Sequence, residues 1–388
     1  MTTSDVFAGQ RGLRERARLE WWVRDGGDPA AVLEDFLADH GLPVRDLSSA
    51  GPGWTGNAAC AAVHLSADAS ALLAGGSVGK PTPAPAIPDV VAIVTDGQPC
   101  TESDDARTPW RLGSWRPSWT PDDHADAVRA VLSAIAEGDV YQVNVVGHAS
   151  APYTGDPGMA LARVAALPGA RYPIVLSGSE WALGCASPET LVSISGGRVV
   201  TKPIKGTRPA TDAGRLELLA SPKERAEHIM IVDLSRNDLA RIARTGSVRV
   251  DELYAIRRWS HLWQAESVVS AQLEEGTGLA DVLRALCPGG SITGAPKLAA
   301  LEQIAALEPV GRGPSMGALG WIGPSGVDLG LTIRTVAVDR ERVHVWAGGG
   351  ITWSSDPAAE VAEAAAKAGP IKAALAGSVG SALVDLAE

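Results

Sequence analysis

The segments IVLSG (174–178), WALGC (181–185), LVSIS (191–195) and RVVTK (198–202) follow one another with only short breaks. Each is rich in apolar or β-branched residues, and the breaks between them contain residues typical of turns, such as Gly and Pro. Short successive strands joined by turns pair most simply with their neighbours in antiparallel order. This stretch therefore predicts an antiparallel sheet.

Upstream of this stretch, the sequence predicts a helix and then a strand. The helix pattern opens at Pro121, keeps apolar residues at helical spacing and ends at Gly138. VYQVNVVGHA (140–149) has the composition of a strand. The first 120 residues give weaker signals, namely a helix pattern at 28–40 and a short buried strand at 90–94.

Downstream, helices and strands are mixed without the regular βαβ order of a parallel sheet. Amphipathic spacing predicts a helix at 223–243, and a Gly-rich turn at 288–294 leads into another helix. The remaining predicted elements are strands at 316–322, 328–338 and 342–348 and an Ala-rich helix at about 356–376. Together these elements indicate an α+β fold.

Composition excludes several classes of protein. The chain has 388 residues, which suits two or three domains or one large domain, and its net charge of −11 makes it a poor nucleic-acid binder. No apolar run approaches the 18 residues that suggest a membrane span, and the N-terminus lacks the apolar core of a signal peptide. The four cysteines form no CxxC pair. We therefore expect a cytoplasmic protein with free thiols that binds neither nucleic acid nor membrane.

The first candidate for chemistry is Lys205, in the motif PIKGT (203–207) at the end of a predicted strand. Partial burial lowers the pKa of a lysine and makes its neutral, nucleophilic form accessible. The competing interpretation is a surface lysine at a strand end.

Carboxylates form the second candidate set. Glu189 stands at a turn after Ser187-Pro188, and two pairs at i, i+3 spacing each share one helix face. These pairs are Glu224 with Glu227 and Glu360 with Glu363. Two such pairs could offer hard oxygen ligands to Mg²⁺, although two solvated helix faces would have the same pattern.

Two Gly-rich segments and one arginine complete the candidates. GGSITGAPK (289–297) resembles an anion-binding turn before a helix, but it lacks the order of a P-loop. AGGGI (347–351) follows a predicted strand and would let a ligand approach the backbone, or else forms a tight bend. Arg334, within the strand predicted at 328–338, could grip a carboxylate with two hydrogen bonds, or lie exposed.

Taken in order, these motifs resemble the chorismate-utilising enzymes over residues 120–376. That family includes anthranilate synthase component I, aminodeoxychorismate synthase component I, isochorismate synthase and salicylate synthase. The motifs that carry the resemblance are GDVYQVN (138–144), SPE (187–189), PIKGTRP (203–209), KERAEHIMIVDLSRNDLARIARTGSVRV (223–250), PGGSITGAPK (288–297), IRT (333–335), AGGGI (347–351) and EVAEAAAK (360–367).

The resemblance implies a fold and a domain organisation. The family's architecture is a sandwich of two large antiparallel sheets flanked by helices, with the site in the cleft. We accordingly expect residues 121–388 to form the chorismate-binding catalytic region. Residues 1–120 would be a short variable part that contributes to the same fold.

Two positions point to one reaction within the family. Isochorismate and salicylate synthases place a water-activating lysine where this chain has Gln142, and anthranilate synthases usually have alanine where it has Lys205. Aminodeoxychorismate synthases resemble this sequence in carrying PIKGT. The resemblance thus implies that Lys205 attacks C2 of chorismate and that ammonia then adds at C4, giving 4-amino-4-deoxychorismate.

The resemblance also implies a role for each remaining site residue. Glu227 and Glu363 would bind Mg²⁺ with support from Glu360 and Glu224, and Glu189 would be the general acid for loss of the C4 hydroxyl. The residues implied in substrate binding are Gly206, Thr207, Thr293, Arg334, Gly348 and Lys367.

The chain departs from anthranilate synthases at one further position. An ungapped alignment puts Gln264 where those enzymes have a histidine, whereas His261 falls three residues early. Some aminodeoxychorismate synthases resemble this chain in having Trp-Gln here, so Gln264 is expected to orient the C4 hydroxyl by hydrogen bonding.

No glutaminase domain is recognisable, so the expected partner is a separate glutamine amidotransferase that supplies ammonia. Two alternatives stay open: anthranilate synthase component I, and a paralogue that binds chorismate without turning it over. The product would feed 4-aminobenzoate and folate supply or another aryl-amine pathway.

Overall fold

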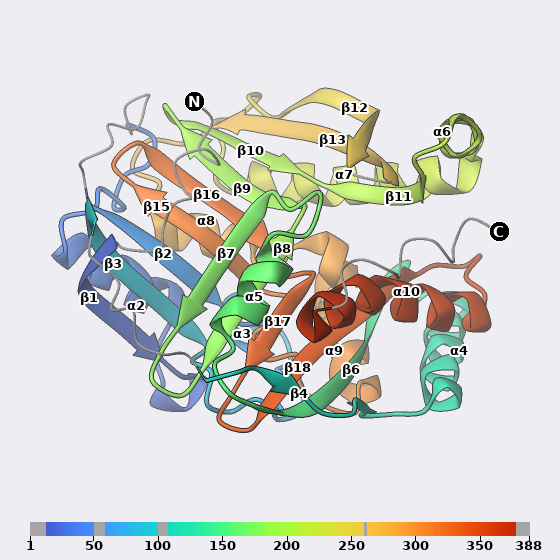
Figure 1. Cartoon of the computed structure of the whole chain (residues 1–388). Helices are drawn as coiled ribbons and strands as arrows, with labels where there is room; N and C mark the ends of the chain where they lie inside the picture. Colours follow the sequence, from blue (N-terminus) through green and yellow to red (C-terminus); the bar gives the residue numbers. More distant parts are fainter. Residues whose placement is uncertain (1–12, 50–58, 100–107, 260–261, 378–388) are drawn as a thin grey trace.

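The computed structural model describes residues 13–49, 59–99, 108–259 and 262–377. Over these residues the chain forms two antiparallel sheets, one of ten strands and one of eight, with helices packed against them (Figure 1). The predicted α+β fold, a sandwich of two large antiparallel sheets with flanking helices, is confirmed. His261, which lies three residues before Gln264 in the sequence, is outside the described residues.

The ten-stranded sheet combines the start of the chain with three later parts. β12 lies beside β13, off the main path of the sheet. In spatial order the strands are β1 (Leu13–Trp21), β3 (Val90–Pro99), β2 (Cys60–Leu65), β15 (Ala318–Gly323), β16 (Gly326–Leu331), β9 (Thr190–Ser195), β10 (Arg198–Lys202), β13 (Leu262–Gln272) with β12 (Arg249–Trp259), and β11 (Ile204–Pro209).

The eight-stranded sheet is centred on the long pair β6 and β18. Two short strands also pair with β6, namely β4 (Arg111–Leu112) and β5 (Arg116–Pro117). The main path runs through β14 (Gly294–Ala295), β6 (Gln142–Thr154), β18 (Arg342–Ile351), β17 (Thr335–Val338), β8 (Ala182–Ser187) and β7 (Tyr172–Ser177).

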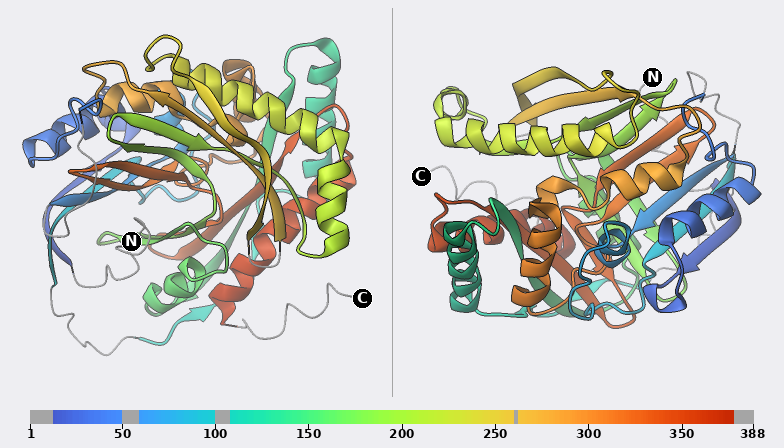
Figure 2. Two further views of the ribbon diagram at one scale, coloured as in Figure 1. Left: turned by 90° about the horizontal axis from the view of Figure 1, so that it is seen from above. Right: turned by 180° about the vertical axis from the view of Figure 1, so that it is seen from behind.

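Helices cover both sheets. Those packed on the ten-stranded sheet or its connections are α2 (Pro29–Asp39), α3 (Ala67–Leu73), α6 (Asp212–Ala220), α7 (Pro222–Ala240) and α8 (Leu279–Leu286). Those packed on the eight-stranded sheet are α4 (Pro121–Glu137), α5 (Gly158–Ala165), α9 (Lys297–Leu307) and α10 (Pro357–Ala376), seen from behind in Figure 2. None of the described helices is long and apolar enough to cross a bilayer.

The four segments at 174–202 are strands, as predicted, but they do not all belong to one sheet. β7 and β8 pair in the eight-stranded sheet, whereas β9 and β10 pair in the ten-stranded sheet. The chain crosses between the sheets at Pro188-Glu189, and Gly196-Gly197, both at positive φ, form the hairpin turn after β9. The crossing places Glu189 at the junction of the two sheets.

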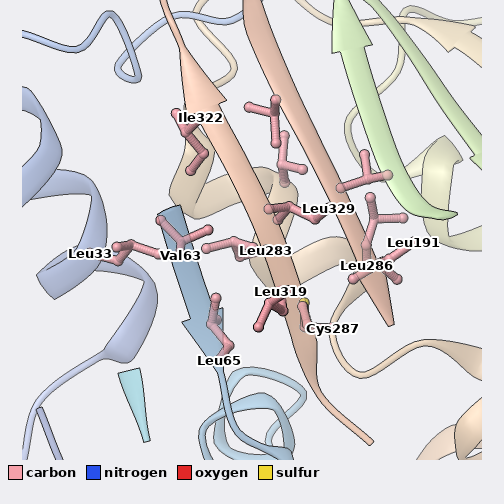
Figure 3. Close-up of a cluster of buried hydrophobic side chains, with 14 of the residues drawn as sticks. Leu33, Val63, Leu65, Leu191, Leu283, Leu286, Cys287, Leu319, Ile322 and Leu329 are labelled. Carbon is pink, nitrogen blue, oxygen red and sulfur yellow. The ribbon is translucent and has the colours of Figure 1, made fainter. Parts of the chain in front are cut away.

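The main hydrophobic core joins both sheets and the helices above them. Its buried members include Leu183 and Ala337 of the eight-stranded sheet as well as Val63 and Leu329 of the ten-stranded sheet. Figure 3 shows the part of this core in which strand residues meet α2 and α8, with Leu33, Val63, Leu65, Leu283, Leu286 and Leu319 among the labelled side chains. Burial of this apolar surface holds the sandwich together.

The N-terminal part supplies an edge of the larger sheet. β1, β3 and β2 pair in that order, and β2 then pairs with β15, so that Leu65 lies opposite Ala318. Cys60, Cys185 and Cys287 are buried free thiols, as expected for the cysteines that the structure describes.

One predicted strand is wrong in its extent. The strand expected at 328–338 is divided into β16 and β17, and Arg334 lies in the bend between them with φ +50°. A positive φ is incompatible with continuous strand geometry for a side chain of this size. Arg334 is therefore not within a strand, although its carbonyl oxygen still accepts a hydrogen bond from the backbone N–H of Ala186 in β8 at 3.1 Å.

Candidate active site

Lys205 lies at the start of a strand rather than at the end of one. β10 stops at Lys202, Pro203 interrupts the pairing, and β11 begins at Ile204. Both strands pair with β13, and the register shifts between Lys205 and Thr207. Gly206 sits in this bulge at φ +85°, a conformation that glycine adopts without strain.

The amine of Lys205 lies inside the molecule, close to the long helix α7. Its Nζ is 3.6 Å from Glu227 Oε2, and the two side chains are only 18% and 13% exposed. Glu227 Oε1 also accepts a hydrogen bond from the Thr352 hydroxyl at 2.7 Å. The surface-lysine interpretation is therefore wrong.

The three glycines of AGGGI lie inside β18, not after a strand, and they pair regularly with β6. A Cβ at Gly350 would lie 2.6 Å from Lys205 Nζ and 2.8 Å from Gln142 Nε2. At Gly349 it would lie 2.9 Å from Glu360 Oε2. The tight-bend interpretation is wrong: glycine here leaves room for polar side chains from three other elements to approach the strand.

Two glutamines, Gln142 beside Lys205 and Gln264 of β13, are buried with polar atoms that lack a partner. Gln142 is fully buried, and neither its amide nitrogen nor its amide oxygen has a hydrogen bond within the described chain. Gln264 is 4% exposed, and its Oε1 is likewise unbonded. Buried polar groups are normally hydrogen-bonded, and each exception calls for an explanation. Binding of a ligand to these free polar atoms would be such an explanation.

Glu189 is a buried carboxyl group at the crossing between the sheets. Burial raises the pKa of Glu189 to about 7, opposed by a hydrogen bond from Ser291, the backbone N–H of Ile204 and the charges of Lys205 and Arg171. The Ser291 hydroxyl donates to Glu189 Oε1 at 2.7 Å. A carboxyl group that titrates near neutrality suits a general acid.

Arg334 brings a guanidinium group to the same junction. Its side chain is half-buried, and within the part of the chain that the structure describes no carboxylate lies within 4.0 Å of it. Burial lowers the pKa of Arg334, and the charge of Glu189 opposes that shift. An unpaired, half-buried guanidinium group can receive an anionic ligand.

The four helix glutamates lie in different surroundings. Glu224 pairs with Arg208 at 3.1 Å, and its Oε2 would be 2.9 Å from a Cβ at Gly206. Glu363 pairs with Lys367 at 2.6 Å, and Lys367 Nζ donates to the carbonyl oxygen of Gly348 at 2.9 Å.

Of the other two, Glu227 lies beside Lys205 and Thr352, and Glu360 approaches Gly349 of β18. Burial raises the pKa of Glu360, and the neighbouring charge of Glu363 adds to that shift. Burial acts in the same direction on Glu363, but the ammonium group of Lys367 keeps the pKa of that carboxyl group below its usual value. The i, i+3 pair on α10 thus holds two like charges close together.

This pair fits Mg²⁺ in its commonest protein setting. The ion takes one or two carboxylates and completes its shell with water or substrate oxygens, and it would relieve the repulsion between Glu360 and Glu363. No three acidic, His or Cys side chains of the described residues lie close enough together to hold a metal without such added ligands. The Mg²⁺ site stays a prediction.

Thr207 and Thr293, both predicted to bind the substrate, have contacts away from Lys205. Thr207 is exposed and pairs with Gln264 in the sheet. Thr293 is 1% exposed, and its hydroxyl donates to the carbonyl oxygen of Gly289 at 2.9 Å. Thr293 lines a cavity with Arg312, whereas Glu189 lines another. Neither threonine hydroxyl is shown beside Lys205, and their contact with substrate stays a prediction.

The structure also adds residues that the sequence did not single out. His228 on α7 is fully buried, its Nε2 lies 2.6 Å from Ser267 Oγ, and burial lowers its pKa to about 4. Arg171 pairs with Glu266 at 2.8 Å near Glu189. Neither had a local signal, because their partners are distant in sequence.

Comparison with known proteins places this geometry in a family. A family model described as chorismate binding enzyme matches residues 81–373. Anthranilate synthase component 1 of Streptomyces coelicolor is 41% identical over 270 residues, which are 66% of this chain and 52% of that protein. Aminodeoxychorismate synthase component 1 of Bacillus subtilis is 37% identical over 274 residues, which are 69% of this chain and 58% of that protein. The chain thus spans a little over half the length of these relatives.

Solved structures share the fold. Anthranilate synthase component I from Streptococcus pneumoniae has a TM-score of 0.76 at 24% identity, covering 93% of this chain and 91% of that one. A 2,3-dihydroxybenzoate-specific isochorismate synthase from Bacillus anthracis has a TM-score of 0.70 at 21% identity, covering 94% and 92%. At these identities the likeness shows the fold alone. From the family match and the order of its motifs, we conclude that this chain belongs to the chorismate-binding enzymes.

Proposed function

We propose that this protein aminates chorismate at C4 to give 4-amino-4-deoxychorismate, with Lys205 as a covalent nucleophile. The observation that carries the proposal is the setting of Lys205, whose half-buried amine lies against Gly350 of β18 beside Gln142 and Glu227. An amine can add to the ring and leave again, which divides one difficult displacement into two easier steps.

The reaction has two displacements. In the first, the neutral amine of Lys205 bonds to C2, both double bonds of the ring diene shift by one position, and the C4–O bond breaks. Glu189 gives its proton to the departing hydroxyl, which leaves as water. In the second, ammonia bonds to C4, both double bonds shift back, and the bond between Nζ and C2 breaks. The new ammonium group at C4 then returns a proton to Glu189. Because burial raises the pKa of Glu189 to about 7, the protonated acid is available near neutrality.

The chain's own charges would hold the two carboxylates of chorismate. Arg334, which has no carboxylate partner in the described chain, suits the enolpyruvyl carboxylate, and Lys367 with the backbone at Gly348 lies on the α10 side. Mg²⁺, when held by Glu227 and Glu363 with support from Glu360 and Glu224, would neutralise and orient the ring carboxylate. These fixed positive charges act locally, within a protein whose net charge is −11.

Gln142 and Gln264 would hold the ring without taking a proton. A neutral amide cannot act as a general base, so Gln142 disfavours attack by water on the ring. The unbonded amide oxygen of Gln264 can accept a hydrogen bond from a hydroxyl of the ligand.

The nitrogen source we propose is a separate glutamine amidotransferase subunit, with the product used for 4-aminobenzoate and folate or for another aryl amine. Two matched relatives carry the name component 1. We expect the purified chain to use ammonium but not glutamine, and to use glutamine once the partner subunit is added. Turnover of glutamine by the chain alone would contradict the two-subunit arrangement.

The decisive experiment is a product assay. Purified protein with chorismate, Mg²⁺, ammonium and an aminodeoxychorismate lyase should form 4-aminobenzoate, measured by chromatography. Formation of anthranilate, seen by its fluorescence, would overturn the proposal in favour of an anthranilate synthase, the activity named for the Streptomyces relative. Tight chorismate binding without turnover would favour a binding paralogue.

A mass measurement tests the covalent step separately. Without ammonia, intact protein incubated with chorismate should gain the mass of chorismate less one water. Lys205→Ala should lose this adduct and on the order of 10³-fold or more in kcat. Lys202→Ala on the adjoining strand is the matched control and should keep both.

A further inference from the structure

Ser291 is a residue of the site whose chemistry the proposed reaction has not used. It lies in the 3₁₀ turn Gly290–Ile292, between α8 and α9, and donates to Glu189 Oε1 at 2.7 Å. The two residues are 102 positions apart in the chain. Their hydrogen bond is thus a product of the tertiary fold.

We propose that Ser291 is a positioning residue for Glu189, which holds one carboxyl oxygen in place while the proton is given to the substrate and taken back. The inference rests on the proposed function, because it assigns Glu189 the part of general acid. A hydroxyl suits this task because it donates to a carboxylate and, after rotation, accepts from a carboxylic acid. The contact can therefore persist in both protonation states.

The turn that carries Ser291 is firmly anchored. Arg312 Nη1 donates to the carbonyl oxygen of Ile292 at 2.7 Å, and Arg312 is itself paired with Glu308 at 2.6 Å in a buried setting. The backbone N–H of Asn144 donates to the carbonyl oxygen of Thr293 at 2.7 Å. The Ser291 hydroxyl is therefore presented from a fixed backbone.

Other polar groups around Glu189 are already engaged. In the cavity that Glu189 and Ser291 line together, the Ser235 hydroxyl donates to the carbonyl oxygen of Ile231 at 3.0 Å, and Asp238 is paired with Lys297 at 2.9 Å. The charged groups that face Glu189 from the packed elements are Arg171, Lys205, Asp238 and Arg334. Among the described residues, Ser291 supplies the side-chain hydroxyl that hydrogen-bonds to the carboxyl group of Glu189.

The hydrogen bond also has a predictable effect on titration. A donor to the carboxylate stabilises its ionised form, so Ser291 lowers the pKa of Glu189 against the larger effect of burial. Glu189 must be protonated to act, so activity falls as the pH rises through that pKa. Removing the donor raises the pKa, and the alkaline limb of the kcat profile should move to higher pH.

The test is the pH dependence of 4-aminobenzoate formation by Ser291→Ala. We expect kcat at neutral pH to fall about 10- to 100-fold, the KM for chorismate to stay within about threefold, and the alkaline limb to move up by about one pH unit. Ser291→Thr, which keeps the hydroxyl, should restore both kcat and the limb. Ser235→Ala, in the same cavity but bonded elsewhere, should leave the profile unchanged.

The outcomes separate this inference from the proposed function. An unshifted alkaline limb in Ser291→Ala, or a Thr variant that restores stability but not the limb, would overturn the positioning role while leaving the reaction intact. Full activity of Glu189→Gln would instead overturn Glu189 as the acid. In the Glu189→Gln background, adding Ser291→Ala should cause no further loss in kcat if the serine acts through Glu189.

Discussion

The strands β6 and β18 pair regularly from Val143–Ile351 at one end to Pro152–Arg342 at the other, but the polar side chains at the two ends differ. At the first end, next to Lys205, Gln142 is fully buried with neither amide atom bonded. At the second end, about 20 Å away by the rise of the strand, the buried polar groups bond to one another.

The second end holds a continuous hydrogen-bonded chain. Ser118 Oγ lies 2.5 Å from His148 Nδ1, His148 Nε2 lies 3.1 Å from His344 Nδ1, and His344 Nε2 lies 3.3 Å from Asp339 Oδ2. With both imidazoles neutral, each N–H or O–H donates toward Asp339 and every acceptor is used. Trp346 packs against both histidine rings.

The difference between the two ends of the strand pair indicates that one end serves ligand binding and the other serves stability. A buried polar network that is satisfied internally rigidifies the fold, whereas buried polar atoms without partners cost stability unless a ligand bonds them. One strand pair thus carries a binding surface at one end and a closed, structural end at the other. Each of the following measurements tests that division.

The largest expected effect is acid destabilisation from the closed end. Burial lowers the pKa of His148 to about 3, and the positive charge of Arg342 adds to the shift. The unfolded chain takes up a proton below about pH 6.5 and the folded chain does not, so stability from His148 is lost as the pH falls from there toward 3. The loss should be on the order of 3 kcal/mol by pH 4.

Urea unfolding of the wild type and His148→Phe at several pH values isolates this contribution from that of other buried histidines. Among these are His64 and His228, whose pKa values burial lowers to about 4. The stability gap between the two proteins should shrink by that amount between pH 7.5 and pH 4. A constant gap would show that His148 is not buried in its neutral form.

The second effect is on catalysis at the open end. A methyl group at Gly350 would lie 2.6 Å from Lys205 Nζ, so Gly350→Ala should displace the amine and lower kcat about 100-fold with little change in stability. Its matched control is Gly147→Ala toward the closed end, where the added Cβ would lie 2.8 Å from Trp119 Nε1. That variant should lose about 1–3 kcal/mol of stability and keep its kcat. The reverse pattern would break the comparison.

A smaller effect follows from cutting the closed chain. Ser118→Ala leaves His148 Nδ1 without its partner and should cost about 1–2 kcal/mol, measured by urea unfolding at pH 7.5. Ser114→Ala, at an exposed position in the same connection, should be neutral. Equal stability of the two variants would mean that the chain contributes nothing to folding.

The smallest expected effect is a gain in stability, whereas the preceding variants lose stability or activity. Gln142→Met replaces a buried, unbonded amide with an apolar group of similar size and should stabilise the free protein by about 1 kcal/mol. The same change should weaken chorismate turnover, because the amide no longer meets the ligand. A loss of stability would indicate that Gln142 already has partners in the free protein.

Local signals in the sequence predicted most elements but not their partners. The helix from Pro121 is bounded by Thr120, whose hydroxyl accepts from Asp123 N, and by Gly138 at φ +88°, and both boundaries can be read locally. Whether β8 and β9 share a sheet depends on contacts made far away, so the crossing at Glu189 could not be read in the same way. The bend at Arg334 is also imposed by tertiary contacts, because the local sequence favours a strand.

The site was less accessible to local reasoning than the fold. Lys205, Glu227 and Glu360 were grouped through the resemblance to a family, since their spacing alone equally suits solvated surfaces. Ser291 had no signal beyond its place in a Gly-rich segment, because its partner Glu189 is distant in sequence. The unbonded state of Gln142 is a property of packing, which no single position encodes.

The strand order has a consequence for how the chain is made. Leu65 pairs with Ala318, so β2, already beside β3, waits for its second partner strand. That strand leaves the ribosome roughly 250 residues later, on the order of 10–50 s at ordinary rates of synthesis. β6 likewise waits for β18. During translation both sheets expose unpaired apolar edges, and non-local pairing of this kind is slow. The nascent protein should therefore depend on chaperones far more than the finished one does.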